Sequence, residues 1–481
     1  MAGENLTEQQ KVMALYSLIG ERGLYVNTAY DVFTDKPEEI PVLQGAYKVP
    51  LITPGTRAYN STLLFATLTS LLNHGTMFVT GAPGIGKTTG MEFAGHFFTK
   101  TPLEEILQAE ILGNPQLKTE DVVASLDTVQ MVHDGKKIVL SSRFLKCPVK
   151  IWDEVNRTPA DLVSSAMKLV DTGKAVYQGV LLESPPGVLF ATANYADEGT
   201  FQLTPPFLDR FDVGVMTTSP PPWDMKKIRQ RGDEKLNGGL DSLLEIPAGY
   251  TLDQGKIREQ IKNMQETTVN GVPEVSSFAD FIYSSLRFSP AASDNLARAT
   301  KGNAWSKTDE DATLKGGHFT DSPFTYIVNE LTVRTVKAME RYAKAFAWIN
   351  GKEQFELSDL KTVVPYLLWH KVQPSQKALT ENPIFANDRI SFIETLLGKI
   401  EQDYTEIQGS EAIKYYAVAL EGLRTGKISG KKTDRGELAN IVRNAIFKVG
   451  SVDKPYALTL ASHLASEYNN RFNGARTENK E

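Results

Sequence analysis

The sequence predicts an α/β fold, in which a parallel sheet is covered by helices on both faces and a mainly helical region follows it. Strand-like and helix-like patterns alternate from about residue 50 to residue 218. A glycine-rich turn at residues 81–86 joins an apolar, strand-like run to a helix-like segment. Beyond the three prolines at residues 220–222, mainly helical patterns recur. Ligands of such sheets bind at the carboxyl ends of the strands, so polar side chains there are the candidates for chemistry.

Composition excludes several classes of protein. The 481 residues suffice for about two to four domains. A net charge of −6 offers no global basic field that would attract nucleic acid. The single cysteine, Cys147, excludes an intramolecular disulfide, and we expect it to be a buried, small apolar residue. Neither a long apolar run nor a basic segment ahead of one occurs, so we predict no membrane span and no signal peptide, and we expect a cytoplasmic protein.

Four regions follow from these patterns. Residues 1–48 are an N-terminal extension with a short amphipathic helix that ends at Gly20 or Gly23. Residues 49–219 form the α/β core, 220–373 a helical region, and 374–481 a further helical extension. The C-terminal extension contains a basic cluster, which we interpret as a solvated loop rather than a nucleic-acid site. The cluster comprises Arg424, Lys427, Lys431, Lys432 and Arg435.

The glycine-rich turn has the spacing of a phosphate-binding loop, with Gly81 followed after four residues by Gly86-Lys87-Thr88. Glycines let the backbone N–H groups approach phosphate oxygens, and the following helix adds the positive end of its dipole. Lys87 can reach the terminal phosphates, and the Thr88 hydroxyl can ligate Mg²⁺. An ordinary strand–turn–helix corner is the alternative. The predicted loop comprises Gly81, Ala82, Pro83, Gly84, Ile85, Gly86, Lys87, Thr88 and Thr89.

Three later elements end in polar residues that suit such a site. A strand at 148–154 delivers Asp153 and Glu154, which we predict to hold Mg²⁺ and to polarise an attacking water, respectively. A strand at 187–194 is expected beside the strand at 148–154. It ends in Asn194, whose amide could orient the attacking water. Arg210 follows a helix start at Thr204 and precedes a last strand at 213–216, and it could reach a nucleotide held by a neighbouring subunit.

Each of these residues has a plainer interpretation. The Asp153-Glu154 pair could be solvated, Asn194 could be a turn residue, and Arg210 could pair with Asp209 or Asp212. Their order behind a phosphate-binding loop favours the functional reading. Together they predict hydrolysis of a nucleoside triphosphate, which depends on positioning and on neutralising charge.

The sequence from residue 61 to about 372 resembles the AAA+ ATPases, and within them the MoxR family. The widely shared pieces are Gly81–Thr88, Phe190–Asn194 and Leu208–Phe211, whereas Trp152–Arg157 and Glu198–Phe201 are typical of MoxR proteins. The resemblance identifies these as Walker A (Gly81–Thr88), Walker B (Asp153 and Glu154), sensor 1 (Asn194) and arginine finger (Arg210). It implies an AAA+ αβα core followed by a helical lid, in which Arg334 would be sensor 2. The arginine-free Ser289-Pro290-Ala291 competes for that position.

The resemblance further implies ATP and Mg²⁺ as cofactors, and a ring with the nucleotide between subunits, which we expect to be a hexamer, as is typical of the family. Its output would be chaperone-like remodelling of a client protein, often with a von Willebrand A domain partner. Two rivals stay open: a nucleic-acid motor on the same module, and a structural subunit clamped by nucleotide with little turnover. The acidic net charge argues against the first, and Glu154 with Arg210 against the second.

Three local expectations complete the prediction. Hairpins are expected around Asp134-Gly135 and around Gln178-Gly179. They fall where the family carries its helix-2 and pre-sensor-1 inserts, which face a pore or a partner, but they could equally decorate the sheet edge. Lys150 interrupts the apolar run before Asp153, which predicts an edge-like or partly wet strand. Ala193-Asn194-Tyr195 stands where the family usually has Gln-Asn-Pro, and this change removes no catalytic group.

Overall fold

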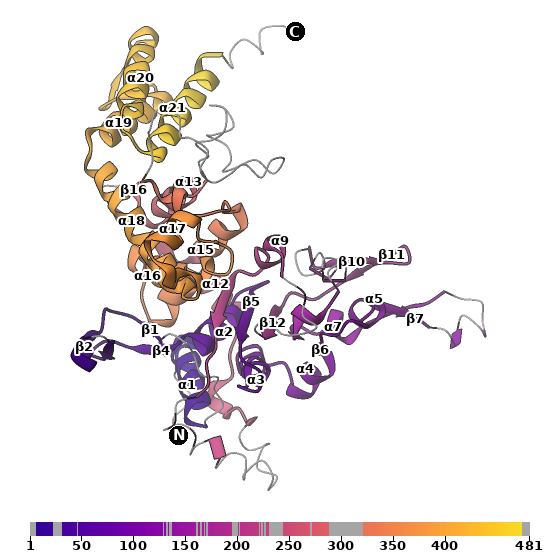
Figure 1. Cartoon of the computed structure of the whole chain (residues 1–481). Coiled ribbons are helices and arrows are strands. Elements are labelled where there is room, and N and C mark those ends of the chain that lie inside the picture. The colour runs from indigo at the N-terminus through magenta and orange to yellow at the C-terminus, as the bar shows by residue number, and fades with distance from the viewer. Residues whose placement is uncertain are drawn as a thin grey trace. The chain divides into compact units, whose positions relative to one another are not determined.

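The computed structural model of the chain (Figure 1) comprises two compact units. The first contains Met1–Val269 and Lys337–His370, and the second contains Asn270–Val336 and Lys371–Glu481. These two units are defined only by how the residues pack in space. The predicted functional boundaries at 219/220 and 373/374 therefore stay predictions. The structure describes residues 6–22, 31–45, 47–127, 137–159, 172–194, 203–220, 244–269, 272–287 and 321–473, and in between residues 129, 130, 133, 162, 163, 166, 167, 169, 201, 222, 225, 228 and 229.

A five-stranded sheet forms the centre of the first unit, in the order β13-β5-β12-β9-β6. Its strands are β5 (Thr76–Gly81), β6 (Ile111–Leu112), β9 (Val149–Asp153), β12 (Val188–Asn194) and β13 (Val213–Met216). All neighbouring strands run parallel. The first six residues of β12 are buried without alternation, as expected for a strand covered on both faces. The predicted parallel α/β fold is therefore confirmed, including the pairing of the Asn194 strand with the Asp153 strand.

Helices cover this sheet. α2 (Ser61–Leu71) is buried along its whole length, and α3 (Lys87–Thr99) leaves the glycine-rich turn and packs on β9. None of the helices in the described part of the chain combines the length and apolarity needed to cross a bilayer. The other helices of the unit are α1 (Glu8–Glu21), α4 (Leu103–Ala109), α5 (Thr119–Val122), α7 (Arg143–Lys146), α9 (Pro205–Leu208), α12 (Gln254–Asn263), α16 (Leu357–Leu368) and the part of α15 (Val333–Ile349) from Lys337 onward.

Short antiparallel pairs extend the first unit. Two of them lie ahead of α2, namely β1 (Asp31–Phe33) with β4 (Ala58–Asn60), and β2 (Glu38–Val42) with β3 (Tyr47–Leu51). Farther along the chain, β14 (Gln265–Glu266) pairs in parallel with β17 (Gln354–Phe355). A two-residue strand, β15 (Thr268–Val269), ends the first stretch of this unit.

The second unit is mainly helical, which confirms the predicted helical region at the C-terminal end. α19 (Glu411–Thr425), α20 (Arg435–Gly450) and α21 (Pro455–Asn473) share one apolar core, centred on residues such as Leu423, Val442 and Leu464. All five residues of the basic cluster are exposed, as predicted, but they lie in two helices and a short antiparallel strand pair rather than in a loop. The remaining elements are β16 (Val272–Pro273), α13 (Glu274–Ser285), α17 (Gln376–Glu381), α18 (Arg389–Gly409), β18 (Lys427–Ile428) and β19 (Lys431–Lys432).

One predicted hairpin is confirmed and the other is corrected. β10 (Lys174–Tyr177) and β11 (Val180–Glu183) pair around Gln178-Gly179, which both have positive φ, as a tight hairpin turn requires. In the other region, β7 (Ala124–Leu126) pairs with β8 (Val139–Ser141), so the first strand lies earlier than predicted. Asp134-Gly135 lies outside the described residues, as do Ser289-Pro290-Ala291 and residues 198–200.

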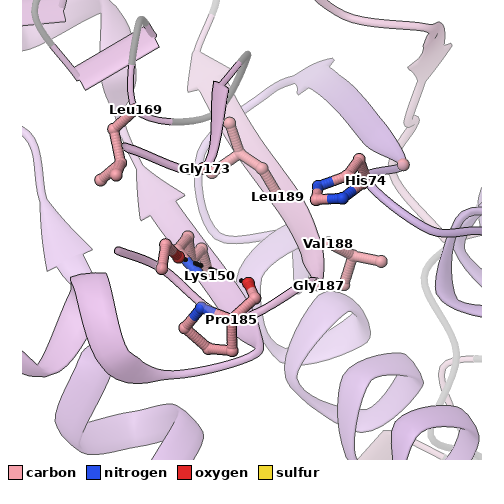
Figure 2. Close-up of a pocket in the computed structure, with 10 residues that line it drawn as sticks. His74, Lys150, Leu169, Gly173, Pro185, Gly187, Val188 and Leu189 are labelled. Carbon is pink, nitrogen blue, oxygen red and sulfur yellow. Dashed lines mark hydrogen bonds between the residues drawn. The ribbon is translucent and has the colours of Figure 1, made fainter. Parts of the chain in front are cut away.

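The expectation for Lys150 is wrong. β9 lies between β12 and β6 rather than at an edge, and Lys150 is only 5% exposed. Its Nζ donates a hydrogen bond of 2.6 Å to the Cys147 carbonyl oxygen. Figure 2 shows Lys150 among the residues that line a cavity of about 20 Å³, together with His74, Pro185 and Gly187. The long side chain thus reaches a buried carbonyl instead of water.

Because of this burial, we expect the protein to become more stable as the pH rises from about 8 to 10. Burial lowers the pKa of Lys150 from 10.5 to about 8. The folded chain therefore releases this proton near pH 8, whereas the unfolded chain retains it up to a pH of about 10.4. In this window the unfolded state binds more protons, so the free energy of unfolding rises with pH, by up to about 3 kcal/mol.

Urea midpoints at pH values of about 7.5, 8.5 and 9.5 would measure this effect. In Lys150→Met, the free energy of unfolding should rise less with pH, because the contribution of Lys150 is missing. Lys146→Met, which changes an exposed lysine four residues earlier, should keep it. Identical profiles for the wild type and Lys150→Met would contradict the assignment.

Candidate nucleotide site

The glycine-rich turn leaves the carboxyl end of β5 and leads directly into α3. Gly84 and Gly86 have φ values of 73° and 81°, a left-handed conformation that other residues adopt with strain. At Gly81, a Cβ atom would lie 2.1 Å from the Thr217 hydroxyl oxygen. Geometry therefore explains all three glycines of the predicted loop, and the loop opens onto the N-terminus of a helix, where anions bind.

Lys87 is the first residue of α3 and is 6% exposed. Its Nζ donates to the carbonyl oxygens of Gly81 (3.1 Å) and Ala82 (2.7 Å), and to Asn194 Oδ1 (2.8 Å). Burial lowers the pKa of Lys87, while the charges of Asp153 and Glu154 act in the opposite direction. The lysine that should meet phosphate is thus held against the loop and tied to the predicted sensor residue.

Thr88 and Asp153 meet as the sequence predicts. The Thr88 hydroxyl donates to Asp153 Oδ1 over 2.8 Å, which joins the first turn of α3 to the end of β9. Asp153 Oδ1 also accepts a hydrogen bond from the Thr192 hydroxyl. The Thr192 oxygen in turn accepts the backbone N–H of Glu154 (3.1 Å). The buried Thr192 therefore orients the Asp153 carboxylate and fixes the backbone of Glu154.

Glu154 lies between two partners. Its Oε1 accepts a hydrogen bond of 2.8 Å from Asn194 Nδ2, and its Oε2 lies 3.1 Å from Arg157 Nε. Asn156, which is 5% exposed, donates to the Asn194 backbone carbonyl. The chain Lys87–Asn194–Glu154–Arg157 therefore connects the phosphate-binding loop with the carboxylate predicted to polarise water.

Sequence reasoning missed the roles of Thr192, Asn156 and Arg157 in this arrangement. Thr192 did carry one usable signal, because residues two apart on a strand share a face, and Asn194 lies on that face of β12. A further carboxyl, Glu110, also escaped notice. Burial raises the pKa of Glu110, and the nearby carboxylates of Glu92 and Asp153 raise it further.

Arg210 lies at the opposite end of β5, where the strand begins. Its backbone carbonyl accepts a hydrogen bond from the Thr76 hydroxyl (3.0 Å), at the start of β5, whereas Gly81 ends that strand. The guanidinium donates to the Pro206 carbonyl of α9 (3.1 Å). Arg334 lies in the first turn of α15 and belongs to the second unit. The structure therefore assembles Lys87, Thr88, Asp153, Glu154 and Asn194, but not Arg210 with them.

The residues present suit a magnesium ion. Thr88 Oγ1 and Asp153 Oδ1 are neighbouring oxygen atoms, and Mg²⁺ bound with a nucleotide takes one or two protein oxygens together with phosphates and water. Within the described residues, no group of three or more His, Cys, Asp and Glu side chains forms a metal cage of its own. The donor set thus fits an ion shared with a phosphate.

Comparisons with known proteins agree with this geometry. Residues 76–211 match the AAA domain family, described as the dynein-related subfamily. A solved structure from Cytophaga hutchinsonii, described as a "putative ATPase", is 18% identical, with a TM-score of 0.52, over 81% of this chain and 96% of that chain. At this identity the likeness shows the fold alone. No curated protein matches. The chain therefore carries an AAA domain at residues 76–211, within an AAA+ αβα core that a helical region follows.

Proposed function

We propose that this protein is a Mg²⁺-dependent AAA+ ATPase that works as a ring, with each ATP held between two subunits. The position of Arg210 is the observation that carries the proposal. Its backbone is fixed at the start of the six-residue strand β5, whereas the phosphate-binding loop begins at the end of that strand. Six residues of strand span about 17 Å, which is more than an arginine side chain can bridge. A neighbouring subunit is therefore the partner that Arg210 can serve.

In this proposal one subunit binds the triphosphate and the next completes the site. Gly81–Thr89 cradles the phosphates, and Lys87 contacts the terminal ones. Thr88 and Asp153 hold Mg²⁺, which neutralises phosphate charge when bound. Glu154 polarises the attacking water, and Asn194, which bonds both Lys87 and Glu154, keeps that water and the γ-phosphate in register. Arg210 of the next subunit stabilises the transition state, and Arg334 acts from the lid side as sensor 2.

In more detail, we propose a MoxR-type enzyme that forms a hexamer and remodels or activates a client protein in the cytoplasm, together with a von Willebrand A domain partner. Two details of the site support it. Asn156 and Arg157, from the stretch typical of MoxR proteins, contact Asn194 and Glu154, so this stretch belongs to the catalytic arrangement. The Glu154→Gln chain with ATP, used as bait, would retain client and partner together.

The proposal is tested first at Lys87. Lys87→Ala should weaken ATP binding and lower turnover by at least about 100-fold, because it removes the ammonium group that would lie between the loop and the terminal phosphates. Fluorescent-nucleotide titration and a phosphate-release assay would measure the two effects. Lys146→Ala, at an exposed lysine, is the matched control and should behave as wild type. Wild-type turnover in Lys87→Ala would refute the proposal, and tight binding without turnover in the wild type would favour a nucleotide-clamped structural subunit.

A further inference from the structure

The residues that directly follow Arg210 contact two helices that lie far away in the sequence. Three contacts bind residues 211–214 to α15 and to the end of α16, all within the first unit. Trp369 Nε1 donates to the Gly214 carbonyl (2.7 Å), and His370 Nε2 lies 3.1 Å from the Phe211 carbonyl oxygen. Arg341 of α15 lies 3.5 Å from the Asp212 carboxylate. The start of β13 is thus clamped by helices that are distant in the sequence.

Asp212 passes this constraint to Arg210 through Thr76. The Asp212 carboxylate accepts the Thr76 backbone N–H (3.3 Å), and the Asp212 N–H donates to the Thr76 hydroxyl oxygen (2.8 Å). The same hydroxyl donates to the Arg210 carbonyl. The Thr76 hydroxyl therefore fixes the backbone on both sides of Phe211, and the Asp212 carboxylate in turn holds the backbone N–H of Thr76.

Arg341 provides a positive charge that helps to keep this carboxylate in place. The Asp212 side chain is 6% exposed, and burying an ionised carboxylate is costly unless it is paired. Arg341 also donates to the Asn73 carbonyl (2.6 Å), so its guanidinium joins the end of α2 to the start of β13. Close packing leaves little room for an alternative, since a Cβ at Gly214 would lie 2.6 Å from the His370 ring.

We propose that Arg341 is a positioning residue for catalysis in the neighbouring subunit, acting through Asp212 and Thr76 on the backbone of Arg210. This inference rests on the proposed function, in which Arg210 serves the next subunit's nucleotide. Without Arg341, the buried Asp212 carboxylate loses its ion pair, and moving towards water lowers its free energy. The backbone of Arg210 then shifts with it. A shift of about 1 Å at a catalytic group costs up to about 100-fold in rate.

Arg341→Gln should therefore lower kcat about 10- to 100-fold and leave the KM for ATP within about twofold. The Arg341 side chain is 36% exposed, so the variant should fold, which its melting profile would verify. Arg341→Lys, which restores a cation, should recover part of the rate. Trp369→Phe, which removes the hydrogen bond to Gly214, is a second variant with the same expected behaviour. Lys337→Gln, one turn away on the same helix and exposed, is the matched control.

Mixing impaired chains separates a role of Arg341 in the neighbour's site from a role in the chain's own site. Arg341→Gln mixed with Glu154→Gln should regain turnover, because the second chain supplies an intact Arg210 to the first chain's intact nucleotide site. Arg341→Gln mixed with Arg210→Ala should not, since both chains then lack a working arginine. The opposite pattern, or no loss of rate in Arg341→Gln, would overturn the inference.

The pair Glu154→Gln with Arg210→Ala tells the two possible failures apart. Restored turnover in that mixture supports the shared site, so a wrong pattern for Arg341→Gln then counts against Arg341 alone. Absence of restoration there overturns the shared site, and the inference with it.

Discussion

Glu154→Gln is expected to bind ATP within about twofold of the wild type and to lose turnover by about 100- to 10,000-fold, the range of general-base catalysis. The carboxylate bonds Asn194 through Oε1 and faces Arg157 through Oε2, and it is joined to the phosphate-binding loop through Asn194, which also bonds Lys87, rather than directly. Glutamine keeps the shape and one acceptor oxygen but cannot take a proton from water. Binding and hydrolysis should therefore separate in this variant.

The measurement combines nucleotide titration with steady-state phosphate release, both at saturating Mg²⁺. Glu183→Gln removes a carboxylate that is 67% exposed on β11, and it should leave both quantities unchanged. Turnover of Glu154→Gln at the wild-type rate would reject the role assigned to Glu154. A loss of ATP binding equal to the loss of turnover would instead mean that the carboxylate supports the loop itself.

Local chemistry explains why the sequence predicts so much of this site. The left-handed backbone at Gly84 and Gly86 requires glycine, so the loop is visible as a residue pattern. Strands buried on both faces appear as unbroken apolar runs. Because the strands are parallel, their last residues all lie on the side of the sheet where the carboxyl ends meet. Asp153, Glu154 and Asn194 are such last residues or their neighbours, and the structure brings them together.

The parts that escaped prediction depend on partners far away in the sequence. Lys150 interrupts an apolar run, but whether it meets water or the Cys147 carbonyl depends on how β6 and β12 flank its strand. Arg341 and Asp212 are 129 residues apart, and nothing local to either indicates the ion pair. The first strand of the hairpin predicted around Asp134-Gly135 lies earlier, at Ala124–Leu126, because the choice of residues that pair with β8 depends on tertiary contacts.

Arg210→Ala should lower turnover by about 1,000- to 100,000-fold, the range measured for arginines supplied to a neighbouring nucleotide. It should leave ATP binding to the isolated chain unchanged. The guanidinium bonds the Pro206 carbonyl of its own chain, and the backbone of Arg210 is fixed at the start of β5, away from its own phosphate-binding loop. Stability should change little, since the side chain is not buried.

Mixed rings give the decisive readout for Arg210. In a one-to-one mixture of Glu154→Gln and Arg210→Ala chains, about a quarter of the head-to-tail interfaces join an intact nucleotide site to an intact arginine. Turnover should therefore rise towards about a quarter of the wild-type rate, provided that interfaces act independently. Arg143→Ala, at an exposed arginine of α7, should stay active alone and is the control for loss of a surface charge. If the mixture is as inactive as its components, Arg210 either serves its own chain or takes no part in hydrolysis, and the shared site fails.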